Sequence, residues 1–136
     1  MNIHLNGEGI DGLASKLAAL GQKAASAVND MLINGSDVLI DGLKSGCDEY
    51  GHNRTGGLRN SINRKAAPKV TEDGGEVVVT FVGADEHGTR YGEIAAYLNH
   101  GTSKISADHW VDNTVERVMP AAKRAMSDTL NAHLGK

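Results

Sequence analysis

The sequence has few aromatic residues, prolines and cysteines. Aromatic side chains make up 4% of its 136 residues, and there are two prolines and one cysteine. A single cysteine excludes an internal disulfide and favours a reducing compartment. No apolar run approaches the ~18–20 residues of a membrane span. The N-terminus also lacks the basic segment followed by an apolar core that is typical of a secretory signal. We therefore expect a protein that has neither a membrane span nor a secretory signal.

Length and composition are those of a globular protein. A chain of 136 residues is suited to one domain with one core, here residues 1–136. Hydrophobic residues make up 40% and charged residues 23%, which are ordinary proportions. The 17 glycines are more than average composition supplies. With so little proline, they predict tight turns and close packing.

The net charge of −3 hides an uneven distribution. Residues 54–69 contain five basic and no acidic side chains, while residues 1–53 and 70–93 are both acidic. Such blocks predict charge-matched contact between strands or between subunits, although solvated strand faces explain them equally well. A mildly acidic chain with no aromatic residues among its basic ones does not predict sequence-specific nucleic-acid binding. The candidate subunit contact is Arg54, Arg59, Arg64 and Lys65.

Two helices are predicted in the first 50 residues. Asp11 can cap a helix in which Leu13, Leu17 and Leu20 share one face, and Gly21 can end it. Apolar residues then recur near a 3.6-residue period from position 22 to position 50. A break at 34–36 would divide this segment into two helices. Its small residues would allow the helix to pack closely on its own sheet or on a neighbouring subunit.

The rest of the chain predicts a hairpin followed by helices. Residues 61–70 favour a strand with Pro68 near its end, residues 71–75 a turn, and residues 76–82 a buried strand. The hairpin would place the basic block opposite part of the acidic block. Residues 91–98 favour a helix over a third strand. A C-terminal helix could be capped by Ser106 or Asp108 and kinked or interrupted at Pro120.

Catalytic chemistry has little support in the sequence. The loop residues Asp85, His87, His100, Asp108 and His109 could converge on a metal, but no metal-binding motif is present and polar loop positions explain them better. Cys47 falls inside the predicted long helix, where a small partly buried residue is the simpler interpretation. We expect that the protein is not an enzyme and binds no cofactor. A small metal-dependent enzyme that uses the loop histidines remains the alternative.

Two elements of the sequence resemble a known family. The first is Thr55-Gly56-Gly57-Leu58-Arg59-Asn60-Ser61-Ile62. The second runs from Arg90 to Trp110, with aromatic residues on either side of the turn His100-Gly101-Thr102. In this order and separation they resemble the neck or head–tail joining proteins of long-tailed bacteriophages, over roughly residues 24–134. The family usually has glutamate at the position of His100, and Pro-Phe where this chain has Asp108-His109-Trp110.

The resemblance implies both a fold and a function. The fold is α+β: a short helix, one long N-terminal helix, a small antiparallel sheet built on a hairpin, and a C-terminal helix packed on the sheet. The function is that of a virion structural protein that joins head and tail or completes the tail, assembled as a homo-oligomeric ring with other neck, connector or tail proteins. It would be made in the host cytoplasm and end in the virion. A tail terminator or minor tail protein is the alternative. The family-signature residues are Thr55, Gly56, Leu58, Ser61, Ile62, Tyr97, Gly101, Thr102 and Trp110.

Overall fold

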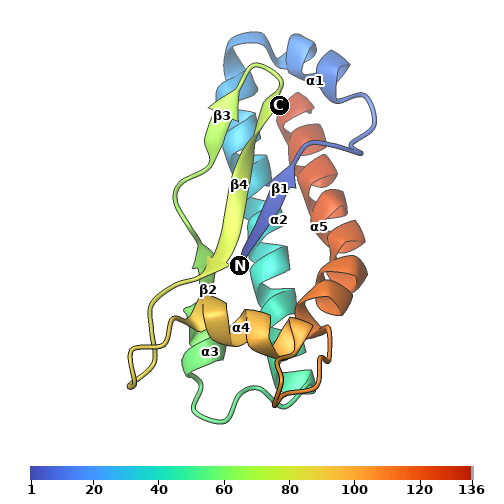
Figure 1. Cartoon of the computed structure of the whole chain (residues 1–136). Helices are drawn as coiled ribbons and strands as arrows, with labels where there is room; N and C mark the ends of the chain where they lie inside the picture. The colour runs from blue at the N-terminus through green and yellow to red at the C-terminus, as the bar shows by residue number, and fades with distance from the viewer. Residues whose placement is uncertain (136) are drawn as a thin grey trace.

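Two long helices packed side by side form the body of the molecule. The computed structural model describes residues 1–135. Helix α2 (Ala24–Glu49) lies against α5 (Trp110–Leu134), and a four-stranded sheet covers one side of this pair (Figure 1). The remaining elements are β1 (Asn2–Asn6), α1 (Leu13–Leu20), a 3₁₀ turn (Gly21–Lys23), α3 (Gly57–Ser61), β2 (Ile62–Arg64), β3 (Lys69–Thr71), β4 (Gly74–Phe81) and α4 (Tyr91–His100). The α+β prediction is confirmed.

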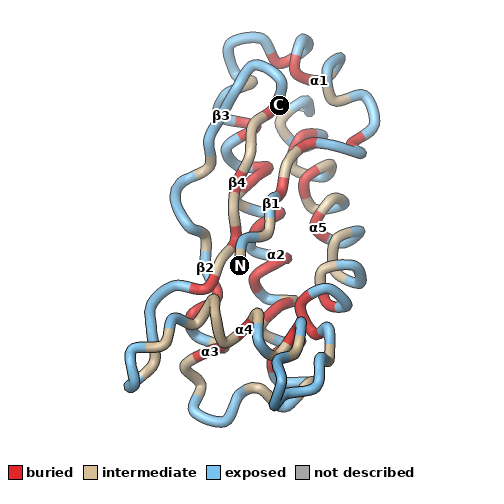
Figure 2. Tube along the Cα trace, in the orientation of Figure 1, coloured by how far each residue is buried: buried red, intermediate tan, exposed pale blue. Residues whose placement is uncertain are grey.

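Strand β4 is the centre of the sheet. It pairs antiparallel with β1 on one side and with both β2 and β3 on the other. Its side chains alternate as expected for a sheet with one covered face: Val77, Val79 and Phe81 are buried, while the residues between them are partly exposed. Helices α2 and α5 cover the buried face, and Figure 2 shows buried residues in red along β4, α2 and α5.

Glycines allow α2 and α5 to approach closely. Residues 22–50 contain one helix and not two, because nothing interrupts α2 at 34–36. A Cβ at Gly46 would lie 2.4 Å from Thr114 Oγ1, and one at Gly35 would lie 2.5 Å from Met126 Cγ. Gly42 meets Val118 in the same way. The three glycines therefore form a close contact with α5, whereas the prediction placed the close packing on the sheet or on a neighbouring subunit.

The buried side chains form two clusters along the helix pair. The aliphatic cluster lies at the α1 end and consists of Leu5, Ile10, Leu17, Leu20, Ala27, Val28, Met31, Leu32, Val77, Met126 and Leu130. The aromatic cluster lies at the α4 end and consists of Leu39, Ile40, Leu43, Cys47, Leu58, Ile62, Val79, Phe81, Ala95, Trp110 and Val111. The two ends of the α2–α5 pair therefore lie in different packing environments.

The predicted strand over 61–70 is wrong in its middle. It consists of the short strands β2 and β3, separated by residues 65–68, and the chain enters it through helix α3, which was not predicted. Pro68 is the last residue of this break and has no N–H to donate to β4, and pairing with β4 resumes at the next residue, Lys69. The predicted Tyr91–Leu98 helix is confirmed as α4.

Two details of the helix predictions are also wrong. Asp11 does not cap α1: the N-cap is Gly12, in a left-handed conformation with φ 67°, and no side chain bonds to that end of the helix. Pro120 does not interrupt α5, which continues through it. The carbonyl that loses its helical bond belongs to Glu116, and both residues are exposed, so water can satisfy it.

Candidate functional site

The two family-signature elements meet at one end of the molecule. Helices α3 and α4 pack together there, beside the C-terminal end of α2 (Figure 1). A Cβ at Gly57 would lie 2.3 Å from the Tyr91 hydroxyl oxygen, so glycine allows this approach. Leu58 and Ile62 are buried in the same cluster as Trp110. Two segments separated in sequence by residues 63–89 are therefore one structural unit, which we call the junction end.

Helix α3 is formed by local hydrogen bonds of the first signature element. The Thr55 hydroxyl accepts a hydrogen bond from the Gly57 N–H at 3.3 Å, and Gly56 adopts φ 77°, which favours glycine. At the other end of the helix, the Ser61 hydroxyl donates to the Leu58 carbonyl at 2.6 Å. This short turn directs the chain from the exposed loop at 51–56 into strand β2.

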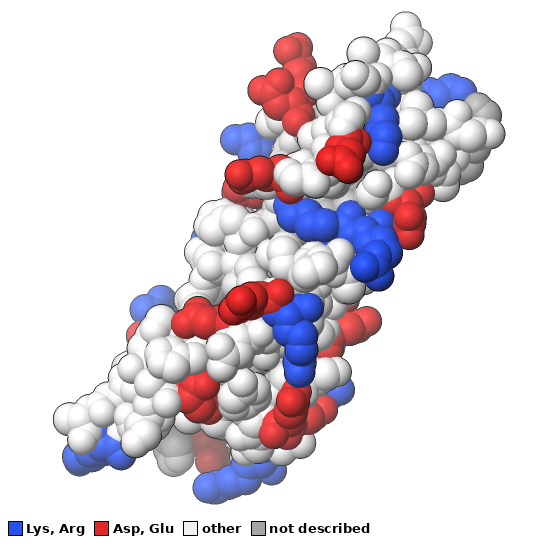
Figure 3. Space-filling view, turned by 90° about the vertical axis from the view of Figure 1, so that its right-hand side faces the viewer, with Lys and Arg blue, Asp and Glu red and all other residues white. Residues whose placement is uncertain are grey.

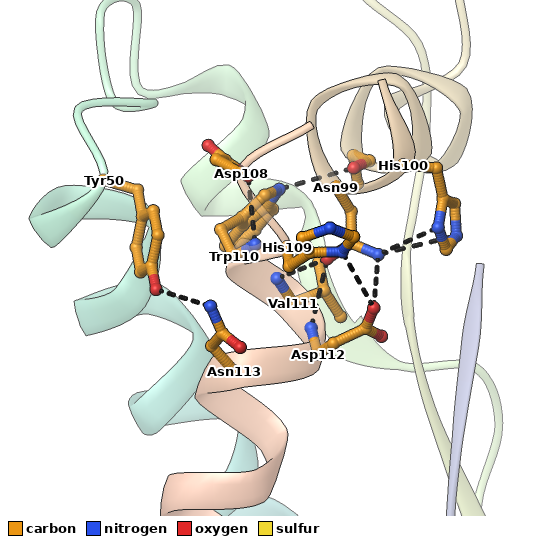
Figure 4. Close-up of polar contacts among 10 residues, drawn as sticks. Tyr50, Asn99, His100, Asp108, His109, Trp110, Val111, Asp112 and Asn113 are labelled. Atoms are coloured by element: carbon orange, nitrogen blue, oxygen red, sulfur yellow. Dashed lines mark hydrogen bonds and ion pairs between the residues drawn. The ribbon is translucent and has the colours of Figure 1, made fainter. Parts of the chain in front are cut away.

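A buried amide connects α4 to the start of α5. Asn99 is fully buried, and its Oδ1 accepts hydrogen bonds from the N–H groups of Val111 at 2.9 Å and Asp112 at 3.1 Å (Figure 4). Its Nδ2 donates to Asp112 Oδ2 at 3.0 Å. The free N–H groups at the start of a helix need such acceptors. Asn99 therefore caps a helix that begins eleven residues after it in the sequence.

Asn99 was not among the predicted functional residues. Capping residues are recognised in sequence because they lie next to the helix they cap, and this one does not. Of the two predicted caps, Asp108 contributes: its Oδ1 accepts the Trp110 N–H at 3.0 Å. Ser106 is exposed, and its side chain forms no hydrogen bond with the helix end. His109 takes a left-handed conformation at φ 55°, the only non-glycine residue in the described chain to do so.

Trp110 is the anchor of the junction end. It is fully buried, and its indole N–H donates to the Ala95 carbonyl at 3.3 Å. Its ring meets Phe81 and His52 edge-on, with ring centroids 5.9 and 5.6 Å apart. The His52 ring also pairs with the Asp108 carboxylate. Such edge-to-face pairs are directional, so the ring holds α4, α5 and the end of α2 in one arrangement.

The loop between α4 and α5 protrudes from this base. Gly101 has φ 83°, and a Cβ there would come within 2.9 Å of the Ala107 nitrogen. The Thr102 hydroxyl accepts the N–H groups of Lys104 and Ile105, and the Thr102 N–H donates to the Ile105 carbonyl at 2.8 Å. Residues 102–107 are all exposed. The loop is thus closed on itself by hydrogen bonds and displayed to solvent.

The basic side chains of residues 54–69 pair mostly with α2 and less with the opposite strand of the hairpin. The Arg59 guanidinium pairs with Asp48 at 3.0 Å, and Arg64 binds both Asp37 and the Ser36 hydroxyl. Across the hairpin, the register places only Lys69 opposite an acidic residue, Glu76. The prediction of opposite blocks in the hairpin is therefore largely wrong, because α2 supplies the nearer carboxylates.

The other two members of the predicted subunit contact are free in this structure. Arg54 and Lys65 are exposed, and neither forms an ion pair with any residue in 1–135. Figure 3 shows the side of the molecule that carries α5, where basic and acidic side chains are interleaved. No single sign of charge dominates that side.

The loop histidines do not gather into a metal centre. Within residues 1–135, no three His, Cys, Asp or Glu side chains lie close enough together to hold a metal ion. Asp85 instead accepts the N–H groups of His87 and Thr89 in its own loop. Cys47 is fully buried, and this burial raises the pKa of its thiol to about 11, which disfavours the nucleophilic thiolate. Among the described helices, none has the length and apolar character to cross a membrane.

One comparison with known proteins gives a match. Residues 11–101 match a family model described as "Bacteriophage HK97-gp10, putative tail-component". The matched region contains all of α3 and α4 and ends at Gly101. No curated protein and no solved structure matches the chain.

Proposed function

Because the chain belongs to the HK97-gp10-like family of phage tail components, we propose that it acts at the interface between head and tail. In this proposal it is a virion structural protein that joins the two or completes the tail. It is made in the host cytoplasm, and its partners are other neck, connector or tail proteins. It works by protein–protein assembly around the DNA channel and carries out no catalysis.

The observation that supports this proposal is the construction of the junction end. Two signature elements converge there on a buried tryptophan, and their combined framework displays a loop whose residues 102–107 are all exposed. An exposed loop held by a buried framework is a common arrangement for a binding surface. Because the loop is already ordered by its own hydrogen bonds, it loses little conformational entropy when it docks.

We further propose that the protein assembles as a homo-oligomeric ring in which basic side chains contribute to the subunit contact. Arg54 and Lys65 are the best candidates, because they are exposed and lack ion-pair partners in the described chain. Arg59 and Arg64 each bind an α2 carboxylate. Reversing their charge would therefore disturb the fold as well as any contact, so Arg54→Glu with Lys65→Glu is the cleaner test.

Deleting the gene and imaging the particles by electron microscopy tests the proposed position. We expect DNA-filled heads separate from complete tails, and restoration of joined particles when the wild-type gene is supplied. Overlong or absent tails would instead support the alternative of a tail terminator or minor tail protein. Infectious particles at normal yield without the gene would contradict both roles.

Complementing the same deletion with the double variant tests the subunit contact. If Arg54 and Lys65 contribute, the variant should restore fewer joined particles than the wild-type gene while remaining folded by circular dichroism. The matched control is Lys44→Glu with Arg124→Glu, since Lys44 is partly exposed on α2, Arg124 is exposed on α5, and neither forms an ion pair with a described residue. Equal complementation by the two double variants would rule out a specific role for the pair.

A further inference from the structure

The protruding loop presents an apolar side chain beside a positive charge. Ile105 is 40% exposed, which makes it one of five large hydrophobic residues in the described chain that are exposed. Lys104, its neighbour, is the only lysine, arginine, aspartate or glutamate in residues 100–107, and it forms no ion pair within residues 1–135. The N–H groups of both residues donate hydrogen bonds to the Thr102 hydroxyl, which fixes their backbone.

A groove with complementary properties lies at the other end of the molecule. It has a volume of about 430 Å³ and is located between α1, the start of α2, and β3. Its apolar lining includes Leu17, Ala24, Val28 and Val70. Val70 is 38% exposed, and Glu72 is the only charged residue in the lining. Glu72 also forms no ion pair with any described residue.

We propose that the loop of one copy docks into the groove of the next copy, with Ile105 against Val70 and Lys104 beside Glu72. The inference rests on the proposed function, because it identifies the surfaces that would build the oligomer. Two exposed apolar side chains would leave water in this contact. One positive and one negative side chain, each without a partner in its own copy, would pair across it.

The positions of the two surfaces determine the kind of assembly. Figure 1 shows the α4–α5 loop and the α1–β3 region at opposite ends of the helix pair. A contact between different surfaces on identical chains is head-to-tail, and its repetition makes a ring when the rotation closes. The same chain cannot satisfy its own loop and groove, so both remain available in every free copy.

Disulfide trapping between purified copies tests the contact directly. One variant carries Ile105→Cys and the other Val70→Cys, and the two are mixed under mild oxidation. The native Cys47 is fully buried and does not compete. We expect about tenfold more linked dimer than from Ile105→Cys mixed with Asp41→Cys, an exposed position on α2, because docking raises the local thiol concentration. Equal yields from the two mixtures would overturn the proposal.

Charge exchange provides an independent test at the same contact. Lys104→Glu or Glu72→Lys alone should lower the trapping rate about fivefold, since an attraction becomes a repulsion at an exposed pair. Combining both substitutions in each copy should restore the rate. Loss without restoration, or no loss at all, would show that these two side chains do not meet. Circular dichroism of each variant confirms that the exposed substitutions leave the fold intact.

Failure of the proposed contact can be distinguished from failure of the proposed function. If gene deletion leaves heads and tails unjoined but trapping fails, the protein joins them through other surfaces. If trapping succeeds and deletion has no effect on particles, the contact is real and the proposed position is wrong. Trapping of the Ile105→Cys loop to a different virion protein inside purified particles, with none to a second copy, would also overturn the contact.

Discussion

The two ends of the core are built from different kinds of side chain. At the α1 end, the cluster around Met31, Met126 and Leu130 is entirely aliphatic. At the junction end, Trp110 and Phe81 pack edge-on, and the buried amide of Asn99 bonds to the backbone of α5. Both ends are fully buried. They differ in whether the contacts prefer one orientation.

This difference separates stability from geometry. Aliphatic packing depends on volume and is tolerant of direction. A buried amide and an edge-on ring pair lose their interaction when the groups rotate. The junction end therefore sets the relative placement of α4, α5 and the protruding loop, while the aliphatic end mainly supplies burial. The following predictions test this distinction.

The largest expected effect follows from removing the anchor. Trp110→Ala should lower the free energy of unfolding by about 3–5 kcal/mol, because a large buried ring leaves a cavity. Leu130→Ala at the aliphatic end should cost a comparable ~2–5 kcal/mol. Only the tryptophan variant should make residues 101–107 sensitive to protease under native conditions. Urea unfolding and limited proteolysis measure the two properties. Equal loop cleavage in both variants would refute the distinction.

Removing the buried amide should have the next largest effect. Asn99→Ala takes away the acceptor of two helix N–H groups in the core, and each such loss costs ~1–3 kcal/mol. We expect a total cost of about 2–3 kcal/mol, because water can partly reach Asp112. The matched control is Asn63→Ala on β2, an exposed residue, which should change little. If denaturant unfolding finds both variants equally stable, Asn99 does not cap α5 in solution.

The contact between α2 and α5 allows the two ends to be compared by the same change, glycine to alanine, at two positions. Gly46→Ala places a methyl against the β-branched Thr114, and overpacking of this kind costs ~1–3 kcal/mol. Gly35→Ala meets Met126 and Leu5, which are also buried, but the unbranched methionine can repack through its rotatable bonds more readily than threonine can. The gain of ~1 kcal/mol in helix propensity then offsets the remaining strain. The midpoint temperature of thermal unfolding should be higher for Gly35→Ala than for Gly46→Ala. The reverse order would contradict this account of the α2–α5 contact.

A smaller change should stabilise the protein. The Thr114 hydroxyl is buried and is the one buried side-chain polar atom in the described chain that lacks a hydrogen-bond partner. Thr114→Val keeps the shape and removes this cost, so the free energy of unfolding should rise by about 1 kcal/mol. Thr129 makes a suitable control, because its hydroxyl bonds to the Ala125 carbonyl at 2.7 Å. Stabilisation by Thr129→Val of the same size would argue against this explanation.

The last effect vanishes at neutral pH and appears only at high pH. The pKa of Cys47 is raised to about 11 in the folded chain from an ordinary value of 9.0, chiefly by burial. Below pH 9 the thiol is neutral in both states and does not affect the equilibrium. Between pH 9 and 11 it ionises only when unfolded, so stability falls with rising pH. Cys47→Ala should flatten that decline. If the free energy of unfolding of Cys47→Ala falls with pH as steeply as that of the wild type, the decline is caused by other groups.

Local patterns in the sequence were sufficient for most elements. The apolar period of 22–50 predicted α2, the β-branched run at 76–82 predicted β4, and the composition of 91–98 favoured helix for α4. Helix α3 was missed because it has only five residues, too few for a period to be visible. The break in the predicted 61–70 strand was missed because Pro68 was read as an edge signal only.

The site was only partly predictable, because its contacts join distant segments. The sequence contained Trp110 and the Gly101-Thr102 turn as recognisable signals, but nothing local marked Asn99 as a helix cap. The ion pairs of Arg59 and Arg64 were assigned to the hairpin because strand pairing could be inferred. The position of α2 beside that strand could not.

The sequence by itself determined most of the secondary elements, the family and the apolar faces of the long helices, since periodicity, turn chemistry and motif order act over short distances. The tertiary structure decided which of those residues meet. It brought two motifs together around Trp110 and placed the α2 carboxylates beside the basic block. It also set the exposed loop and the apolar groove at opposite ends of one helix pair. These outcomes depend on how α2 and α5 pack, and packing is a property of surfaces that no single segment contains.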